Sequence, residues 1–213
     1  MKLIKRFSRV IVSFKVKAKI LLLFAILISL YSCNLPSYVF DNKGQTSGLD
    51  FTKGKWLINH IDAPSDVSKQ LTKYAKEDFE KYLPGRLFFI YEPKGLILPQ
   101  KININPSKSL LKEIKKGSGF DYFINIRAGK LKDELGGIDI TPNHFYTDRE
   151  NKSEVIIEVY DLNLSQIIYS QKVIGSVATQ KGNDEVQFSK SSGSLILGCY
   201  KKLMKDIDGK SIK

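Results

Sequence analysis

Few side chains in this sequence are of the types that perform acid–base or nucleophilic chemistry. Only two histidines occur, His60 and His144, and their surroundings are those of structural or solvated side chains rather than catalytic bases. Ser118 stands between two glycines, but a plain helix-to-strand turn also requires small residues there. The sequence holds no Gly-x-Ser-x-Gly elbow, phosphate-binding loop or His-Glu-x-x-His motif. We therefore predict that the protein is not an enzyme.

One stretch has the residue spacing of a calcium-binding loop. Asp139, Thr141, Asn143 and Glu150 stand at relative positions 1, 3, 5 and 12 of such a loop. Position 6 is His144, where the sharp turn of the loop requires glycine. The flanking sequences also have the pattern of strands rather than helices. We therefore predict no metal and no cofactor.

The remaining reactive types are two cysteines, Cys33 and Cys199, without a Cys-x-x-Cys pair that would indicate zinc. Cys199 lies on the apolar stripe of an expected helix, which indicates a small core residue rather than a reactive thiol. Trp56, the only tryptophan, stands at the beginning of the first expected strand. Core packing and a surface anchor for a partner are both open interpretations of Trp56.

The first 33 residues have the organisation of an export signal. Seven Lys and Arg residues and no acidic residue occur before an uncharged apolar run from Ile20 to Leu30. The following Leu30-Tyr31-Ser32-Cys33 resembles the lipobox of bacterial lipoproteins. The resemblance implies cleavage between Ser32 and Cys33, a diacylglycerol thioether on Cys33 and acylation of the new amino group. An uncleaved membrane helix is one alternative, although Pro36 and several polar residues interrupt it. An ordinary cleaved signal is the other.

Processing would change the charge balance. The whole chain has 34 Lys and Arg against 22 Asp and Glu, a net charge of +12. Removal of the seven basic residues of the signal leaves 27 against 22, a net charge of +5. Such a mild excess does not indicate a nucleic-acid partner. The membrane, through the lipid, and an unidentified envelope protein are the expected partners, in an unknown oligomeric state.

The mature chain is expected to be one domain on a tether. The Asn-, Ser- and Gly-rich stretch over 33–53 is expected to be flexible, followed by a domain over 54–209 and a tail over 210–213. The apolar side chains within this stretch are possible docking points on the domain: Tyr38, Val39, Phe40, Leu49 and Phe51. Apolar periodicity and Gly/Pro breaks predict the elements of the domain. Helices are expected over 65–83 (with Ser65 as its cap), 105–117 and 187–207; strands over 55–61, 87–91, 120–131, 154–160 and 166–177; 96–104 is ambiguous. The fold class is therefore α/β: a single-layer mixed sheet of about five strands with helices packed against it, in the order β-α-β-α-β-β-β-α.

Two short motifs within this domain resemble a known family. Gly119-Phe120-Asp121-Tyr122 is similar to the entry into the third strand of curli-secretion-type lipoproteins. The segments Val159-Tyr160-Asp161-Leu162 and Ile167-Ile168-Tyr169-Ser170 are similar to their next hairpin. The same fold occurs in the TolB amino-terminal domain and in lipoprotein activators of penicillin-binding proteins. The resemblance implies the fold of residues 55–207 and leaves the task open.

The expected function is that of a lipid-anchored, non-enzymatic binding or scaffold domain of the bacterial envelope, on the outer membrane facing the periplasm. A subunit of an export or assembly machine and, less favoured, an envelope hydrolase are the alternatives. The segment 132–153 is expected to be a loop containing few core positions, with a short strand-like stretch at Ile138 and Ile140. Its Phe145 and Tyr146, together with Trp56, are the expected partner contacts.

Overall fold

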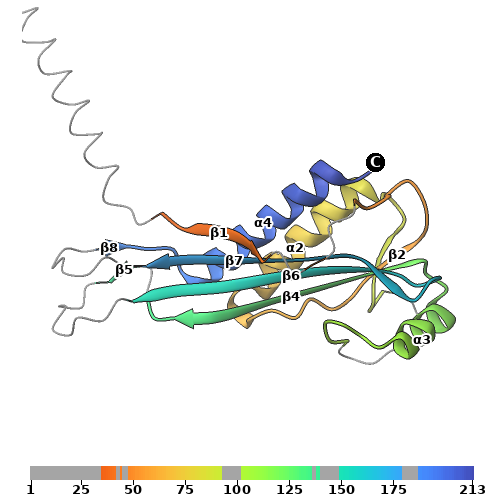
Figure 1. Ribbon diagram of the computed structural model, residues 1–213, viewed down its shortest axis with the longest axis horizontal. Helices are drawn as coiled ribbons and strands as arrows, with labels where there is room; N and C mark the ends of the chain where they lie inside the picture. The colour runs from red at the N-terminus through yellow and green to blue at the C-terminus, as the bar shows by residue number, and fades with distance from the viewer. Residues whose placement is uncertain are drawn as a thin grey trace, which may run out of the picture.

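A computed structural model describes residues 35–41, 44, 48–92, 102–135, 138–139, 149–178 and 187–213. Figure 1 shows the arrangement of the elements, and their labels are used from here on. The described elements are β1 (Ser37–Asp41), β2 (Trp56–Ile58), α2 (Ser65–Tyr82), β3 (Leu87–Phe89), α3 (Lys108–Ser118), β4 (Tyr122–Asp133), β5 (Ile138–Asp139), β6 (Glu150–Asp161), β7 (Gln166–Ala178), β8 (Gln187–Phe188) and α4 (Ser192–Lys210).

The main sheet has six strands in the order β1-β7-β6-β4-β2-β3. Strand β2 is parallel to both β3 and β4, whereas the β1-β7, β7-β6 and β6-β4 pairs are antiparallel. Strands β5 and β8 form a separate two-stranded sheet. This mixed, open sheet confirms the predicted α/β class, and the strand number is close to the expected five.

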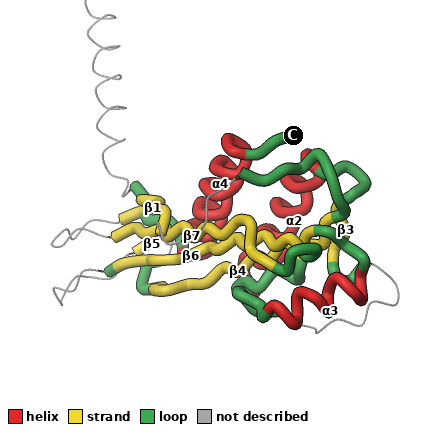
Figure 2. Tube along the Cα trace, turned by 45° about the vertical axis from the view of Figure 1, so that its right-hand side comes forward, coloured by secondary structure: helices red, strands yellow, loops and turns green. Residues whose placement is uncertain are grey.

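Helices cover both faces of the sheet, because successive side chains of a strand point to opposite faces. Figure 2 shows α2 and α4 on one face and α3 beyond the other, near one end of the strands. The main core under α2 and α4 includes Trp56, Ile58, Ile124, Ile126 and Ile157. A second cluster joins α3 to Leu57, Phe123 and Tyr160. The predicted alternation of Ile124, Ile126 and Ala128 is confirmed.

The helix ends differ in detail from the predictions. Ser65 does not cap α2, because Pro64 takes the cap position and makes no side-chain cap bond. Helix α3 begins after Ser107, whose hydroxyl accepts a hydrogen bond from the backbone N–H of Leu110. Helix α4 begins later than expected, at Ser192, since Gln187 and Phe188 pair with β5. Ser191 supplies the side-chain acceptor that an N-cap requires.

The expected flexible tether contains ordered structure that belongs to the domain. Strand β1 pairs with β7 over all five of its residues, and the side chains of Leu49 and Phe51 are buried. The expected tail is also tied down, because the backbone N–H of Phe51 donates to the carbonyl of Ile212 at 2.9 Å. The domain thus begins before Gly54 and extends past residue 209. The sequence did not indicate the amino-terminal boundary of the domain, because β1 is short and stands among polar residues.

Strand β1 is held in place by a slot between β7 and α4. A Cβ atom on Gly198 would lie 2.1 Å from the hydroxyl oxygen of Tyr38, and one on Gly175 would lie 2.9 Å from its ring. Only glycine at these two positions leaves room for the aromatic ring. The carboxylate of Asp41 adds an ion pair of 2.6 Å with the ammonium of Lys172. Packing and charge therefore both attach β1 to the sheet.

Candidate functional site

Most residues predicted to carry function fall outside the described part of the chain. Ser32 and Cys33 of the expected cleavage site do so, and so do Phe145 and Tyr146 of the expected contact surface. His144 lies outside it as well. These assignments stay predictions.

Trp56 is a core residue and does not reach the surface as a partner contact. Its side chain is 0% exposed and stacks on Tyr122 with ring centroids 4.3 Å apart. The indole N–H donates to the carbonyl of Lys53 at 3.0 Å, so its one polar group is satisfied inside the fold. The interpretation of Trp56 as a surface anchor is therefore wrong, and core packing explains its position.

The other chemically notable residues are dispersed. Cys199 is fully buried against Gly175, and burial raises the pKa of its thiol to about 12. A protonated, enclosed thiol of this kind is a poor nucleophile. His60 is exposed, just beyond β2. Within the described residues, no three His, Cys, Asp or Glu side chains come together in a way that could hold a metal ion.

The segment 132–153 is more structured than expected at both of its ends. Strand β4 extends to Asp133 and β6 begins at Glu150, so that Lys132 pairs with Lys152. Leu135 is buried, and its backbone N–H donates to the amide oxygen of Asn151 at 2.8 Å. Leu135, Asn151 and Ser153 are the buried side chains among the described residues of this segment, and the expectation of few core positions stays a prediction for the rest of it. The short strand expected at Ile138 is present as β5.

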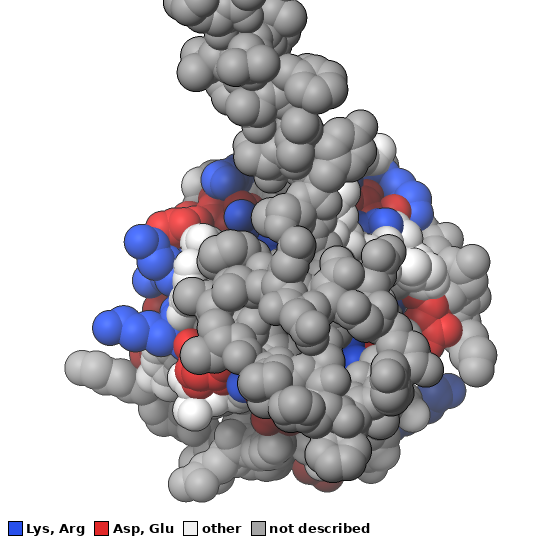
Figure 3. All heavy atoms as spheres, turned by 90° about the vertical axis from the view of Figure 1, so that its left-hand side faces the viewer, with Lys and Arg blue, Asp and Glu red and all other residues white. Residues whose placement is uncertain are grey.

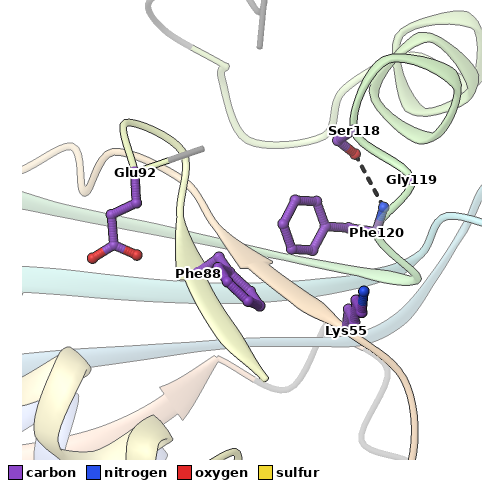
Figure 4. A pocket seen from close by; sticks show the side chains of 6 residues that line it. All are labelled: Lys55, Phe88, Glu92, Ser118, Gly119 and Phe120. Carbon is purple, nitrogen blue, oxygen red and sulfur yellow. Dashed lines mark hydrogen bonds between the residues drawn. The ribbon is translucent and has the colours of Figure 1, made fainter. Parts of the chain in front are cut away.

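A groove of about 600 Å³ lies at the opposite end of the sheet, where β2, β3 and the α3–β4 connection meet. Figure 4 shows the side chains that line it. They are Lys55, Phe88, Glu92, Ser118, Gly119 and Phe120. The rings of Phe88 and Phe120 lie 5.2 Å apart at an angle of 58° and form the apolar part of the groove. Figure 4 places them between the Lys55 ammonium and the Glu92 carboxylate.

The wall that carries Phe120 is built by the end of α3. Gly119 adopts a left-handed backbone with φ of 72° and terminates the helix, a conformation that glycine adopts without strain. The hydroxyl of Ser118 donates to the carbonyl of Ile114 at 2.6 Å and accepts from the backbone N–H of Phe120 at 3.3 Å. These bonds turn the chain so that Phe120 points towards Phe88 (Figure 4). Ser118 is thus a turn residue, as its position between two glycines indicated.

The two charges at the groove differ in their freedom. One carboxylate oxygen of Glu92 accepts from the backbone N–H of Phe89 at 2.8 Å, and the other lies 4.0 Å from the ammonium of Lys76. The ammonium of Lys55 makes no hydrogen bond or ion pair within the described part of the chain. Lys55 is also solvent-exposed. The groove therefore offers one available cation beside the half-buried ring of Phe88 and the edge of the ring of Phe120, which is 7% exposed.

Asp121 fixes the three segments that meet behind the groove. Its carboxylate accepts from the backbone N–H of Lys55 at 3.0 Å, from the ammonium of Lys115 at 2.9 Å and from the side-chain amide of Asn163 at 3.4 Å. These groups come from the residue before β2, the last turns of α3 and the β6–β7 turn. The hydrogen bond from Lys115 is the largest cause that lowers the pKa of Asp121. The Gly119-Phe120-Asp121-Tyr122 motif therefore has a structural explanation in this chain.

A buried polar network holds the chain that leads into α3. The side-chain amide of Asn59 donates to the carbonyl of Ile102 at 2.8 Å, and that of Asn125 donates to the carbonyl of Asn103 at 2.8 Å. On the neighbouring strand the carboxylate of Glu158 is 95% buried and accepts two hydrogen bonds. One comes from the hydroxyl of Tyr160 at 2.5 Å and the other from the backbone N–H of Asn105 at 2.9 Å. Asn105 has a positive φ of 57°, so these bonds hold an unusual backbone turn.

The side chains that line the groove can be compared with those that a hydrolytic site requires. A hydrolytic site brings a nucleophile, a base and an orienting group together. Here the one lining hydroxyl, that of Ser118, donates to a backbone carbonyl, and the lining includes no histidine or cysteine. Sequence reasoning missed the groove because Lys55, Phe88 and Phe120 are far apart in the chain. Only the parallel alignment of β2 with β3 and β4 brings them together.

Comparisons with known proteins find similarity in structure alone. No protein-family model and no curated protein matches the sequence. Similar solved structures include the PelC dodecamer from Paraburkholderia phytofirmans, at 10% identity and a TM-score of 0.45, covering 84% of this chain and all of that one. Lipoprotein GNA1162 from Neisseria meningitidis has 11% identity and a TM-score of 0.36, with 74% and 99% covered. Protein XCC0632 from Xanthomonas campestris has 7% identity and a TM-score of 0.36, with 84% and 91% covered.

These neighbours include a bacterial lipoprotein, and their low similarity carries no information on function. The fold class rests on the structure itself. Among the helices that the structure describes, none is long and apolar enough to cross a membrane.

Proposed function

We propose that the protein is a bacterial lipoprotein, cleaved between Ser32 and Cys33 and held to the outer membrane, facing the periplasm, by lipid on Cys33. The basic segment, the apolar run and the Leu30-Tyr31-Ser32-Cys33 sequence support this proposal. In the structure, strand β1 begins at Ser37, four residues after Cys33. Lipid on Cys33 would thus be attached to a folded domain with little chain between them.

The domain itself is proposed to be a non-enzymatic binding module. The observation that supports this proposal is the groove, which combines two aromatic rings with an available cation and brings no catalytic set together. Aromatic rings provide contact area at low conformational cost, while a charge orients the partner. The proposed occupant is a segment of an envelope protein with an apolar side chain for the Phe88–Phe120 surface and a neighbouring carboxylate for Lys55.

Site-specific photocrosslinking in living bacteria tests the groove. With p-benzoylphenylalanine in place of Phe88, we expect a crosslinked protein that is absent when the same residue replaces Lys69, an exposed position of α2. Lys55→Glu should weaken this crosslink at least about tenfold, because it turns the attracting charge into a repelling one. Lys69→Glu changes the net charge equally and should leave the crosslink intact. Crosslinks of equal yield at positions 88 and 69 would contradict a binding role of the groove.

The anchor is tested by Cys33→Ser. Because the thiol carries the lipid, and the lipoprotein peptidase acts after lipid transfer, the variant should incorporate no palmitate and remain uncleaved. Metabolic palmitate labelling and the mass of the purified protein measure both effects. Ser32→Ala keeps a small residue before the cleavage site and should be processed normally. Palmitate incorporation at wild-type levels in the Cys33→Ser variant would rule the anchor out.

A further inference from the structure

The connection between Cys33 and the folded domain is too short to act as a tether. Ser37, the first residue of β1, follows Cys33 by four positions. Even a fully extended chain spans at most about 14 Å over that distance. Strand β1 cannot extend this reach, because it is paired along its whole length with β7 and its Tyr38 fills the slot at Gly175 and Gly198.

We propose that the end of the sheet where β1 begins lies against the lipid headgroups of the membrane and that the groove is held at the far end. This inference rests on the proposed lipidation of Cys33. The register identifies the described residues of this membrane-facing end. Ser37 is opposite Ser176, Ser176 is opposite Lys152, and Lys152 is opposite Lys132. Lys190 joins them, because its carbonyl accepts from the side-chain amide of Asn151 at 3.0 Å.

The charges of the described residues at this end favour the anchor, rather than electrostatic attraction, as the cause of the orientation. Figure 3 views the molecule from this side, and the basic and acidic side chains that it shows in colour alternate around the rim of this face. Among the described residues, the basic group is Lys132, Arg149, Lys152 and Lys190, and the acidic group is Asp133, Glu134 and Glu150. A nearly balanced surface gains little from anionic lipid, unlike a polybasic segment. The exposed aliphatic side chain of Leu35 lies nearest to the anchor in sequence.

The length of the sheet determines how far the groove stands from the membrane. Strand β7 runs ten residues from Ser176, at the membrane-facing end, back to Gln166, which pairs with Asp161. Asp161 in turn pairs with Tyr122, two residues after Phe120 of the groove. Ten residues of antiparallel strand span about 34 Å. In Figure 1, β1 begins at one end of the long strands, and α3 lies at the other. A partner in the groove is therefore bound in the aqueous space, well clear of the headgroups.

Fluorescence quenching by spin-labelled lipid tests this orientation. The lipidated protein carries a thiol-reactive fluorophore at position 190 (Lys190→Cys) or at position 116 on α3 (Lys116→Cys), and the buried Cys199 stays unlabelled. The protein is inserted into phosphatidylcholine vesicles that contain a headgroup nitroxide lipid. We expect quenching at position 190 to exceed that at position 116 at least about threefold, since nitroxide quenching is limited to short range. Adding phosphatidylglycerol should not change this ratio. Equal quenching at the two positions would overturn the inference.

A matched insertion isolates the role of the short connection. Twenty Gly and Ser residues placed between Asn34 and Leu35 add a mean reach of about 25 Å, so the domain should rotate freely and the two positions should be quenched alike. The melting temperature should not change. If position 190 stays strongly quenched with the insertion, the surface itself binds lipid and the proposed cause is wrong. Mass spectrometry of the same protein separates the two proposals. Lipid missing from Cys33 contradicts the anchor, whereas lipidated protein with equal quenching contradicts the orientation alone.

Discussion

The two faces of the main sheet differ in the roles of their buried side chains. The face under α2 and α4 is mainly apolar, with Ile126, Ile157 and Leu203 among its fully buried residues. Its buried polar side chains include Asn151, Ser153 and Gln171, which lie on the same face as Ile157. The face under α3 contains buried amides and a carboxylate, Asn59, Asn125 and Glu158, that hold one particular chain path. Apolar burial is non-directional, whereas hydrogen bonds fix geometry. The first face therefore contains the larger apolar cluster, and the hydrogen bonds of the second hold the chain that leads to the groove.

The largest effect is expected from a charge placed on the apolar face. Ile157→Asp would bury an unpaired carboxylate under α2 and α4 and should cost more than about 4 kcal/mol of unfolding free energy. Thermal melting followed by circular dichroism measures the loss. Ile156→Asp, one residue away and half-buried on the other face, should cost much less. A melting temperature of Ile157→Asp within about two degrees of wild type would show that the assigned faces are wrong.

A smaller effect is expected on the polar face. Tyr160→Phe removes one of the two donors to the buried Glu158 carboxylate while it keeps the ring, so the unfolding free energy should fall by about 1–3 kcal/mol. Burial and the neighbouring Glu158 raise the pKa of Tyr160, so its hydroxyl remains a donor at neutral pH. Chemical denaturation measures the loss, and amide exchange should report faster opening of α3. Tyr91→Phe removes an exposed hydroxyl and is the matched control. Equal stability of the two variants would contradict the role assigned to the network.

The smallest effect, about 1 kcal/mol, is expected from Asp121→Asn, and it should depend on pH. The pKa of Asp121 is lowered in the folded protein, so its carboxylate stabilises the fold above the unfolded-state pKa of about 3.9. This contribution disappears as the pH falls through the folded-state pKa. The difference in melting temperature between wild type and variant should therefore be largest near pH 7 and shrink below about pH 4. Glu113→Gln, exposed on α3, should melt like wild type throughout. If the difference in melting temperature does not vary with pH, the charge of Asp121 does not contribute to stability through its ion pair with Lys115.

The apolar face could be predicted from the sequence to a much greater extent than the polar one. The alternation of Ile124 with Ile126 and the helical stripe through Leu195 and Leu203 are periodic signals that depend on burial alone. The groove has no such signal, because its rings come from β3 and from the α3–β4 connection. Strand β1 was missed for a related reason. The slot at Gly175 and Gly198 lies far along the chain from β1, and no local sequence pattern indicates that β1 occupies it.

That slot also affects the order in which parts of the chain can fold. The hydroxyl groups of Ser37 and Ser176 are joined across a separation of 139 residues, and the ammonium of Lys202 donates to the carbonyl of Tyr38 across 164. Contacts between such distant residues form late and slow folding. In the proposed export, amino terminus first, β1 would cross the membrane at the beginning and β7 and α4 at the end. Under that proposal β1 would have no pairing partner until β7 had followed it, and the slot for Tyr38 would be complete only after α4 had formed.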